Sequence, residues 1–289
     1  MDLAEPTAWS GYRCELGEGV RWTGDKLVHV DTMSGRLLTL ADAEPTSKPP
    51  TVLAAVDVPL GSVAPWFGRP GSWIAAAGTG IAMVTEPGEL RWMTTLTEGA
   101  PTAMRMNDGV CDPAGRFWAT SMAYNNTPGL GGLYRTDPDG SVTLALTGLT
   151  VPNGPAFAPD GTLMYLSSST DGRIDVYTVE DDSSLSVGRQ FVQLDADLWP
   201  DGMTVDEEGY LWVAIWNGSA VHRYSPDGEL DGSVWLPTSR PTSCWFGGPD
   251  RSRLFITTAS YGLDPADEAA GRVYAIDVGV RGPAAVPFG

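Results

Sequence analysis

One short pattern occurs three times in this sequence with the same internal spacing. Each copy opens on an Asn-Asp-Gly, Asn-Gly or Asp-Gly step, reaches a turn glycine eight residues after its first residue, and continues into apolar and aromatic residues. The copies are Asn107 to Trp118, Asn153 to Tyr165 and Asp201 to Trp212. Constant spacing of this kind indicates one supersecondary unit used repeatedly, which excludes most fold classes at once.

Looser copies of the pattern complete a set of six. They begin at Glu18, near Ser62 and near Thr242, so consecutive starts lie about 45 residues apart. Within the units, turn residues separate short runs of strand-forming residues, and no segment shows sustained helical periodicity with caps. Units of this length with four short strands each are typical of sheets that pack around a central channel. The sequence therefore predicts an all-β fold, a six-bladed β-propeller.

The last unit is one strand short. In the fifth unit we expect strands over 202–206, 211–216, 221–225 and 233–237, whereas the sixth offers three strands before a Gly- and Pro-rich stretch at 282–287. The stretch 7–14 precedes the first unit, and a strand there would close the last blade and cover its open edge. We therefore expect one domain over residues 1–289. Two domains split near Val151 would need a linker, which the sequence does not show.

Charge and cysteine usage limit the partners and the location. Subtracting 36 acidic from 18 basic residues gives −18, which disfavours nucleic acid because its binding depends on clustered Lys and Arg. Pro, Arg and Gly interrupt the longest apolar neighbourhood, 62–84, and the first residues lack the features of a signal peptide, so we expect no membrane association and no secretion. Three widely separated cysteines do not suggest disulfides, and we expect a cytoplasmic protein.

The available chemistry is also restricted. Two histidines are too few for a three-His zinc site. The sequence contains no G-x-S-x-G, Walker A or G-x-G-x-x-G motif, which removes the common nucleophile and phosphate-binding signatures. Any reaction must therefore use carboxylates and amides, with or without a metal ion.

The residues that open the six repeats are expected to precede the inner strands and to meet at one mouth of the channel. They are Glu18, Ser62, Asn107, Asn153, Asp201 and Thr242. Asn-Gly and Asp-Gly most often form turns, but each repeat already has its own turn further along. A cation between Glu18 and Asp201 would offset their repulsion. Oxygen ligands select hard cations, so we expect Ca²⁺, with Mg²⁺, Mn²⁺ or Zn²⁺ as alternatives.

Four blocks of the sequence resemble the signature blocks of the SMP-30/gluconolactonase/luciferin-regenerating family. They are Leu16 to Trp22, Arg105 to Gly109, Val151 to Gly154 and Pro200 to Met203, and the likeness runs from about residue 14 to residue 278. The resemblance implies that Glu18, Asn153 and Asp201 hold a divalent ion. It also implies that Arg105 and Asn107 contact the substrate and that Asp201 is the general base. The reaction it implies is the gluconolactonase-like opening of a sugar lactone or a related cyclic ester.

Two long loops, 121–132 and 258–271, are expected on the same face as the ring of polar residues. They make Tyr124 and Asn125 candidate substrate contacts, and Tyr124, Trp216 and Tyr261 candidate aromatic walls. Sugar-lactone members of the family often carry an acidic residue in the third-blade loop, where this chain has Tyr124-Asn125-Asn126.

Three functions remain open at this stage. The first is a metal-dependent hydrolase for a small-molecule substrate, in which the ion polarises a lactone carbonyl and an activated water attacks it. The second is a family member recruited to a biosynthetic pathway, acting on another ester or cyclic intermediate. The third is a non-catalytic binding propeller with a structural ion. Arg105 beside Asn107 favours an enzyme, because a scaffold has no need for this pair at the ion.

Overall fold

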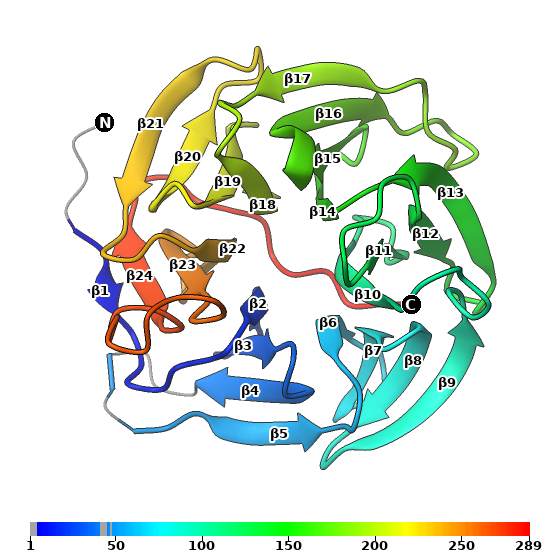
Figure 1. Cartoon of the computed structure of the whole chain (residues 1–289), viewed down its shortest axis with the longest axis horizontal. Helices are drawn as coiled ribbons and strands as arrows, with labels where there is room; N and C mark the ends of the chain where they lie inside the picture. Colours follow the sequence, from blue (N-terminus) through cyan, green and yellow to red (C-terminus); the bar gives the residue numbers. More distant parts are fainter. Residues whose placement is uncertain (1–4, 41–44, 47) are drawn as a thin grey trace.

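Six four-stranded sheets stand in a ring around a central axis in the computed structural model (Figure 1), which describes residues 5–40, 45–46 and 48–289. The predicted domain also includes residues 1–4, 41–44 and 47, which lie outside the described part. Neighbouring strands within the sheets pair antiparallel. The predicted six-bladed β-propeller is confirmed.

The strands run from the channel outward within each blade. Blade 1 contains β2 (Gly17–Thr23), β3 (Lys26–Asp31), β4 (Arg36–Leu40) and β5 (Thr51–Ala55). Blade 2 contains β6 (Leu60–Pro65), β7 (Ser72–Ala77), β8 (Gly80–Thr85) and β9 (Glu89–Thr95). Blade 3 contains β10 (Met104–Cys111), β11 (Phe117–Ala123), β12 (Gly131–Thr136) and β13 (Val142–Leu149).

The other three blades follow the same plan. Blade 4 contains β14 (Pro152–Phe157), β15 (Leu163–Ser168), β16 (Arg173–Thr178) and β17 (Arg189–Gln193), with the short 3₁₀ helix η1 (Ser169–Asp171) after β15. Blade 5 contains β18 (Trp199–Val205), β19 (Leu211–Trp216), β20 (Ala220–Tyr224) and β21 (Leu230–Trp235). Blade 6 contains β22 (Pro241–Gly247), β23 (Arg253–Thr258), β24 (Val273–Asp277) and β1 (Thr7–Ala8). Within residues 5–40, 45–46 and 48–289, no helix is long and apolar enough to cross a membrane.

Two expected strand starts in blade 5 are wrong by three residues, and the other differences there are one or two residues. The inner strand β18 begins at Trp199 instead of 202, because a shift in register lets the pairing with β19 continue across the Asp-Gly step. The outer strand β21 begins at Leu230 instead of 233, because a tight turn closed by Gly228 N–H and Ser225 C=O (2.9 Å) ends just before it. The strand expected over 211–216 is β19.

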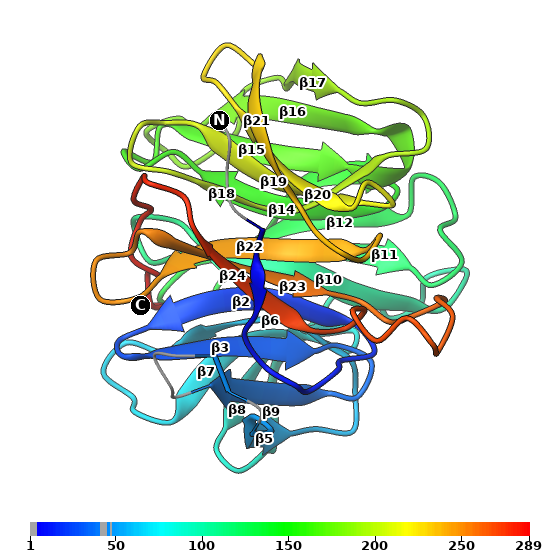
Figure 2. The ribbon, with the colours of Figure 1, turned by 90° about the vertical axis from the view of Figure 1, so that its left-hand side faces the viewer.

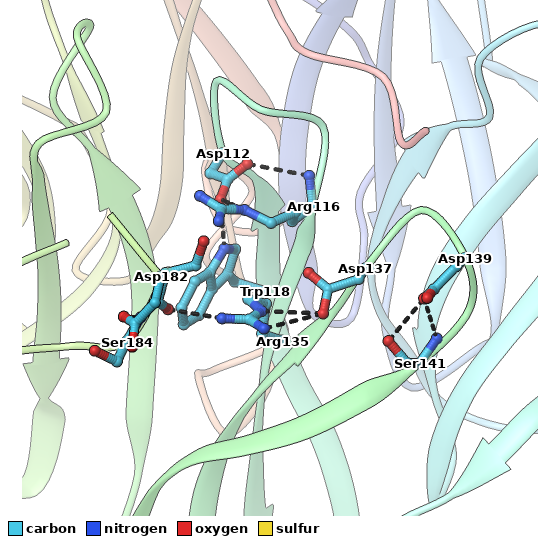
Figure 3. Close-up of polar contacts among 10 residues, drawn as sticks. Asp112, Arg116, Trp118, Arg135, Asp137, Asp139, Ser141, Asp182 and Ser184 are labelled. Carbon is cyan, nitrogen blue, oxygen red and sulfur yellow. Dashed lines mark hydrogen bonds and ion pairs between the residues drawn. The ribbon is translucent and has the colours of Figure 1, made fainter. Parts of the chain in front are cut away.

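A buried aspartate explains why the repeat contains a turn followed by tryptophan. Asp112 Oδ1 accepts hydrogen bonds from the backbone N–H groups of Ala114 and Arg116, both at 3.0 Å. Its Oδ2 accepts from Arg116 Nε at 2.6 Å and from Trp118 Nε1 at 2.8 Å (Figure 3). Asp206 does the same in blade 5, where its Oδ2 accepts from Trp212 Nε1 at 2.9 Å. The carboxylate therefore fixes the turn and the indole of the second strand together.

The N-terminal strand closes the ring, as expected. In β1, Thr7 pairs with Ala275 and Ala8 with Tyr274, on the outer edge of β24. Trp9 follows directly, donates its backbone N–H to the Val273 carbonyl at 2.7 Å, and is only 3% exposed. Its ring meets Phe255 edge-on, with 5.1 Å between the ring centroids. The closing strand is short, so the buried indole supplies most of its contact.

The C-terminal tail, residues 281–289, crosses one mouth of the channel (Figure 1). Gly282 N–H bonds to the Arg251 carbonyl in blade 6 (3.0 Å), and at the other end Gly289 N–H bonds to the Gly115 carbonyl in blade 3 (3.0 Å). Phe288 is fully buried edge-on to Trp66 of blade 2. Figure 2 shows the tail on the opposite side of the ring from the loop between β23 and β24. The tail thus covers one mouth and leaves the other available for a site.

Replacing Trp9 tests the closure. Trp9→Ala should lower the free energy of unfolding by about 3–5 kcal/mol, the usual loss for a buried aromatic side chain, because the indole that packs against Phe255 next to β1 is lost. The measurement is urea unfolding followed by circular dichroism. Val187→Ala is the control, since Val187 is 95% exposed and should be near neutral. An unfolding curve of Trp9→Ala that matches the wild type would contradict the closure.

Buried His29 predicts a specific pH dependence. This side chain in β3 is 1% exposed, and burial lowers its pKa to about 4. An unfolded histidine titrates near pH 6.5, so between about pH 6.5 and pH 4 the unfolded state binds more protons and stability falls as the pH falls. His29→Gln should remove about 3 kcal/mol of this loss, measured by urea unfolding from pH 7 to pH 4. Val28→Ala, in the same strand, should lower stability by a similar amount at every pH. An equal pH slope in the wild type and His29→Gln would refute the assignment.

Candidate active site

Each inner strand carries a β-bulge at the start of its repeat. The pairing register shifts between Glu18 and Arg21, Leu60 and Ser62, Met106 and Gly109, Asn153 and Ala156, Pro200 and Met203, and Pro241 and Ser243. The opening residues of the repeats therefore lie within the inner strands and not before them, which corrects the sequence expectation. A bulge leaves a residue unpaired and re-aims its side chain. The Asn-Gly and Asp-Gly steps serve here as bulges instead of reverse turns.

The bulges do not send all six side chains to the same place. Ser62 Oγ donates to the Gly109 carbonyl at 2.5 Å, and Thr242 Oγ1 donates to the Gly17 carbonyl, so both are used to join neighbouring blades. The other four members of the expected ring line one cavity of about 210 Å³, together with Arg105: they are Glu18, Asn107, Asn153 and Asp201. The aromatic side chains expected as walls also line it: Tyr124, Trp216 and Tyr261.

Two carboxylates in this cavity have oxygen atoms without a partner. Glu18 Oε2 and Asp201 Oδ1 are buried and accept no hydrogen bond from any residue that the structure describes. Burial, and then the charges of Asp201 and Asp108, raise the pKa of Glu18 well above its usual range. Burial, and then Asp108, raise the pKa of Asp201 as well, while Arg105 opposes the shift. The cavity therefore concentrates negative charge that its hydrogen bonds do not compensate.

A chain of hydrogen bonds fixes the amide side chains beside these carboxylates. Arg105 Nη1 donates to Asn107 Oδ1 at 2.7 Å, and Asn107 Nδ2 donates to Asn153 Oδ1 at 2.6 Å. Asn153 Nδ2 in turn donates to Ser169 Oγ at 3.1 Å, and Ser169 Oγ donates to the Pro200 carbonyl at 2.7 Å. The chain crosses blades 3, 4 and 5. It orients one amide oxygen and one guanidinium toward the same cavity.

Asp108 is a third buried carboxylate near the site, but it does not line the cavity. Its Oδ1 accepts from the backbone N–H of Gly109 at 2.7 Å, and its Oδ2 accepts from that of Gly154 at 3.2 Å. Burial raises its pKa to about 6, and the charge of Arg21 opposes the rise. Asp108 thus joins two inner strands and adds to the negative charge on the axis.

The donor set fits a divalent cation. Each of the two carboxylates offers an unpartnered oxygen, and Asn153 Oδ1 keeps one lone pair beyond the hydrogen bond from Asn107. Carboxylate and amide oxygens are the ligands that Ca²⁺ and Mg²⁺ prefer. Among the described residues, no group of three or more His, Cys, Asp or Glu side chains is arranged to hold a metal. A set of two carboxylates and one amide does not form such a group, so the bound ion stays a prediction.

Several residues that line the cavity were not predicted from the sequence, and one predicted substrate contact lies outside the cavity. Asn125 is exposed and does not line the cavity; its Oδ1 accepts from the backbone N–H (3.2 Å) and the hydroxyl (2.7 Å) of Thr127, while the next residue, Asn126, lines the cavity. Ser169 reaches the cavity from η1, and no motif marked it. Trp199 was not predicted because its strand was expected to start three residues later; in the structure it pairs opposite Trp216 and lines the cavity.

The fold and the site define a class of protein: a six-bladed propeller with a buried polar cluster at one mouth of its channel. A sequence model described as the SMP-30/Gluconolactonase/LRE-like region matches residues 16–260. The chain therefore belongs to the SMP-30/gluconolactonase/LRE-like family, in agreement with the four blocks of its sequence.

Similar proteins include enzymes and a calcium-binding protein. Pentonolactonase XacC of Haloferax volcanii is 34% identical over 284 residues, which cover 93% of each chain. The solved structure of a luciferin-regenerating enzyme has a TM-score of 0.88 at 28% identity and covers 98% of this chain and 99% of that chain. The structure of a calcium-binding protein, regucalcin, from Agrobacterium tumefaciens has a TM-score of 0.89 at 25% identity and covers 99% of this chain and 97% of that chain.

Chelation tests the predicted ion. An ion at 100 times its dissociation constant stabilises a fold by about 2.7 kcal/mol, so excess chelator should lower the melting temperature by roughly 5 °C. Glu18→Gln should abolish most of this difference. With chelator present, Glu18→Gln should melt above the wild type, because it lacks one of the mutually repelling carboxylates. Differential scanning calorimetry and elemental analysis measure the effect. Unchanged melting of the wild type in chelator, with no metal found, would rule the ion out.

Proposed function

We propose that this protein is a lactonase, a divalent-metal-dependent hydrolase that opens a cyclic ester. Membership of the family and the similarity to a pentonolactonase over 93% of both chains support the reaction class. The observation that carries the proposal is the pairing of two unpartnered carboxylate oxygens with Arg105 and Asn107 in one cavity. A purely structural ion would not need a charged guanidinium beside it.

Arg105 contacts the substrate in this mechanism, and Asn107 positions Arg105. Arg105 Nη1 is fixed by Asn107 Oδ1 at 2.7 Å and by the Met106 carbonyl at 3.0 Å. The remaining N–H groups of the guanidinium make no hydrogen bond within the described part of the chain, so they can orient the lactone. Because the guanidinium is held before the substrate arrives, it can oppose the negative charge that develops on the carbonyl oxygen without costly reorganisation.

Asp201 is the general base in this mechanism. It accepts the proton of the attacking water as the new C–O bond forms, and this proton passes to the ring oxygen when the ester C–O bond breaks. The products are a carboxylate and an alcohol on one open chain, with a proton released to solvent. A divalent ion held by Glu18, Asn153 and Asp201 would supply Lewis-acid polarisation of the lactone carbonyl.

The location in the cytoplasm stays a prediction from the sequence. The three cysteines, Cys14, Cys111 and Cys244, are all free and buried, which is consistent with it.

Replacing Asp201 separates its two roles. Asp201→Asn keeps an oxygen ligand but loses the base, so turnover should fall about 10²–10⁴-fold at matched metal occupancy. The measurement is hydrolysis of several five- and six-membered lactones, followed by the acid that each releases. Asp227→Asn, at an exposed turn, is the matched control and should keep wild-type rates.

The outcomes of this experiment are distinct. Equal rates for the wild type and Asp201→Asn would exclude Asp201 as the base. If the metal-loaded wild type opened no lactone, the result would count against the reaction itself and favour a binding propeller or a biosynthetic enzyme for another substrate.

A further inference from the structure

The cavity combines a polar cluster with apolar and aromatic walls. Besides Glu18, Asp201 and their neighbours, the lining includes six apolar side chains: Leu16, Met33, Met122, Val151, Trp199 and Trp216. They come from blades 1, 3, 4 and 5, so the apolar lining surrounds the cavity instead of forming one patch. A ligand whose reacting group lies at the carboxylates must place its other atoms against this surface.

The aromatic part of the wall is built as a unit. Trp199 and Trp216 lie directly opposite each other in the pairing of β18 with β19. The guanidinium of Arg240 lies over the Trp216 ring, 4.8 Å from its centroid, and Arg240 Nη1 donates to the Tyr261 carbonyl. Arg240 therefore ties the loop between β23 and β24 to the indole of blade 5. The wall keeps its shape without a ligand, which favours recognition of a flat, rigid group.

Few polar atoms of the cavity remain for substrate hydroxyls. The hydrogen-bond chain already engages Asn107, Asn153 and Ser169 with one another and with backbone carbonyls. In the proposed reaction, Arg105 is committed to the carbonyl group. The other polar lining residues stand on loops and already meet solvent: Tyr124 and Tyr261 are 46% and 53% exposed, and Asn126 is partly exposed. A hydroxyl group buried among methionine and tryptophan without a partner would weaken binding by roughly tenfold or more.

We propose that the substrate is a lactone carrying an aryl group, and not a polyhydroxylated sugar lactone. The inference rests on the lactonase function proposed above and specifies its substrate class. An aryl ring can stack against Trp199 and Trp216 in an offset or edge-on arrangement, and Met33 and Met122 can adapt to its edge. Binding then comes from the burial of apolar surface, while Arg105 and the carboxylates act on the ester alone.

Two cyclic amides provide a test of binding that does not depend on turnover. The aryl probe is 1,4-dihydroisoquinolin-3-one, and the hydroxylated probe is glucono-δ-lactam; each is a six-membered lactam that resists hydrolysis. Calorimetric titration of the metal-loaded protein should give at least about tenfold tighter binding of the aryl lactam. Tighter binding of glucono-δ-lactam would overturn the inference.

Variants of one wall residue show whether the aromatic surface causes the preference. Trp216→Ser should weaken binding of the aryl lactam about tenfold and change binding of glucono-δ-lactam less than about threefold. Trp216→Phe should restore most of the affinity. Trp235→Ser is the matched control, because Trp235 is 66% exposed on the outer strand β21 and does not line the cavity. Equal losses for both lactams in Trp216→Ser would also overturn the inference, because they would reflect general damage to the site.

The corresponding lactones distinguish a failure of this inference from a failure of the proposed reaction. Isochroman-3-one should be opened with at least about tenfold higher kcat/KM than glucono-δ-lactone. Faster opening of glucono-δ-lactone would refute the substrate class and support the lactonase function. If neither lactone is opened, the proposed reaction fails, and the lactam affinities still decide whether the cavity prefers an aryl ring.

Discussion

The closed ring is the constraint on which the rest of this structure depends. Each blade packs mainly on its two neighbours, so a gap between blades 6 and 1 would free both of their inner strands. The short β1, the buried indole of Trp9 and the C-terminal tail prevent this by joining blades that are distant in the sequence. Because the inner strands are held, side chains from blades 1, 3, 4 and 5 can keep fixed positions in one cavity.

Burying carboxylates in fixed positions costs free energy. The structure compensates this cost at some carboxylates and not at others. Asp112 and Asp206 are buried, but turn amides and indole N–H groups surround their oxygens. Glu18 and Asp201 instead keep oxygens without a hydrogen bond, and their pKa values rise. The carboxylate oxygens that lack hydrogen bonds therefore identify the site better than the acidic composition of the chain does. This lack also explains why a cation, rather than further hydrogen bonds, is the partner to expect.

Features that recur with the repeat could be predicted from the sequence, and features that depend on register or long-range packing could not. The spacing of the repeat predicted the six blades. It also predicted that four side chains would meet, because equivalent positions of a ring face the same axis: Glu18, Asn107, Asn153 and Asp201. The β-bulges were not predictable, because an Asn-Gly step suits both a turn and a bulge. For the same reason nothing in the sequence separated Ser62 from its equivalents; its hydroxyl meets a backbone carbonyl that lies 47 residues away along the chain.

The two parts of the cavity have different structural origins. Its carboxylates and amides stand on bulged inner strands that all blades share, so they are held by the hydrogen-bonded core of the ring. Much of the rest of its wall comes from connections that differ from blade to blade, such as the turn at Met33 and the loops that carry Tyr124 and Tyr261. A change in a connection can alter the wall without disturbing the ring, whereas a change in an inner strand affects both. The carboxylates and amides are therefore tied to the repeat, whereas the wall combines strand residues such as Trp199 and Trp216 with the irregular segments between strands.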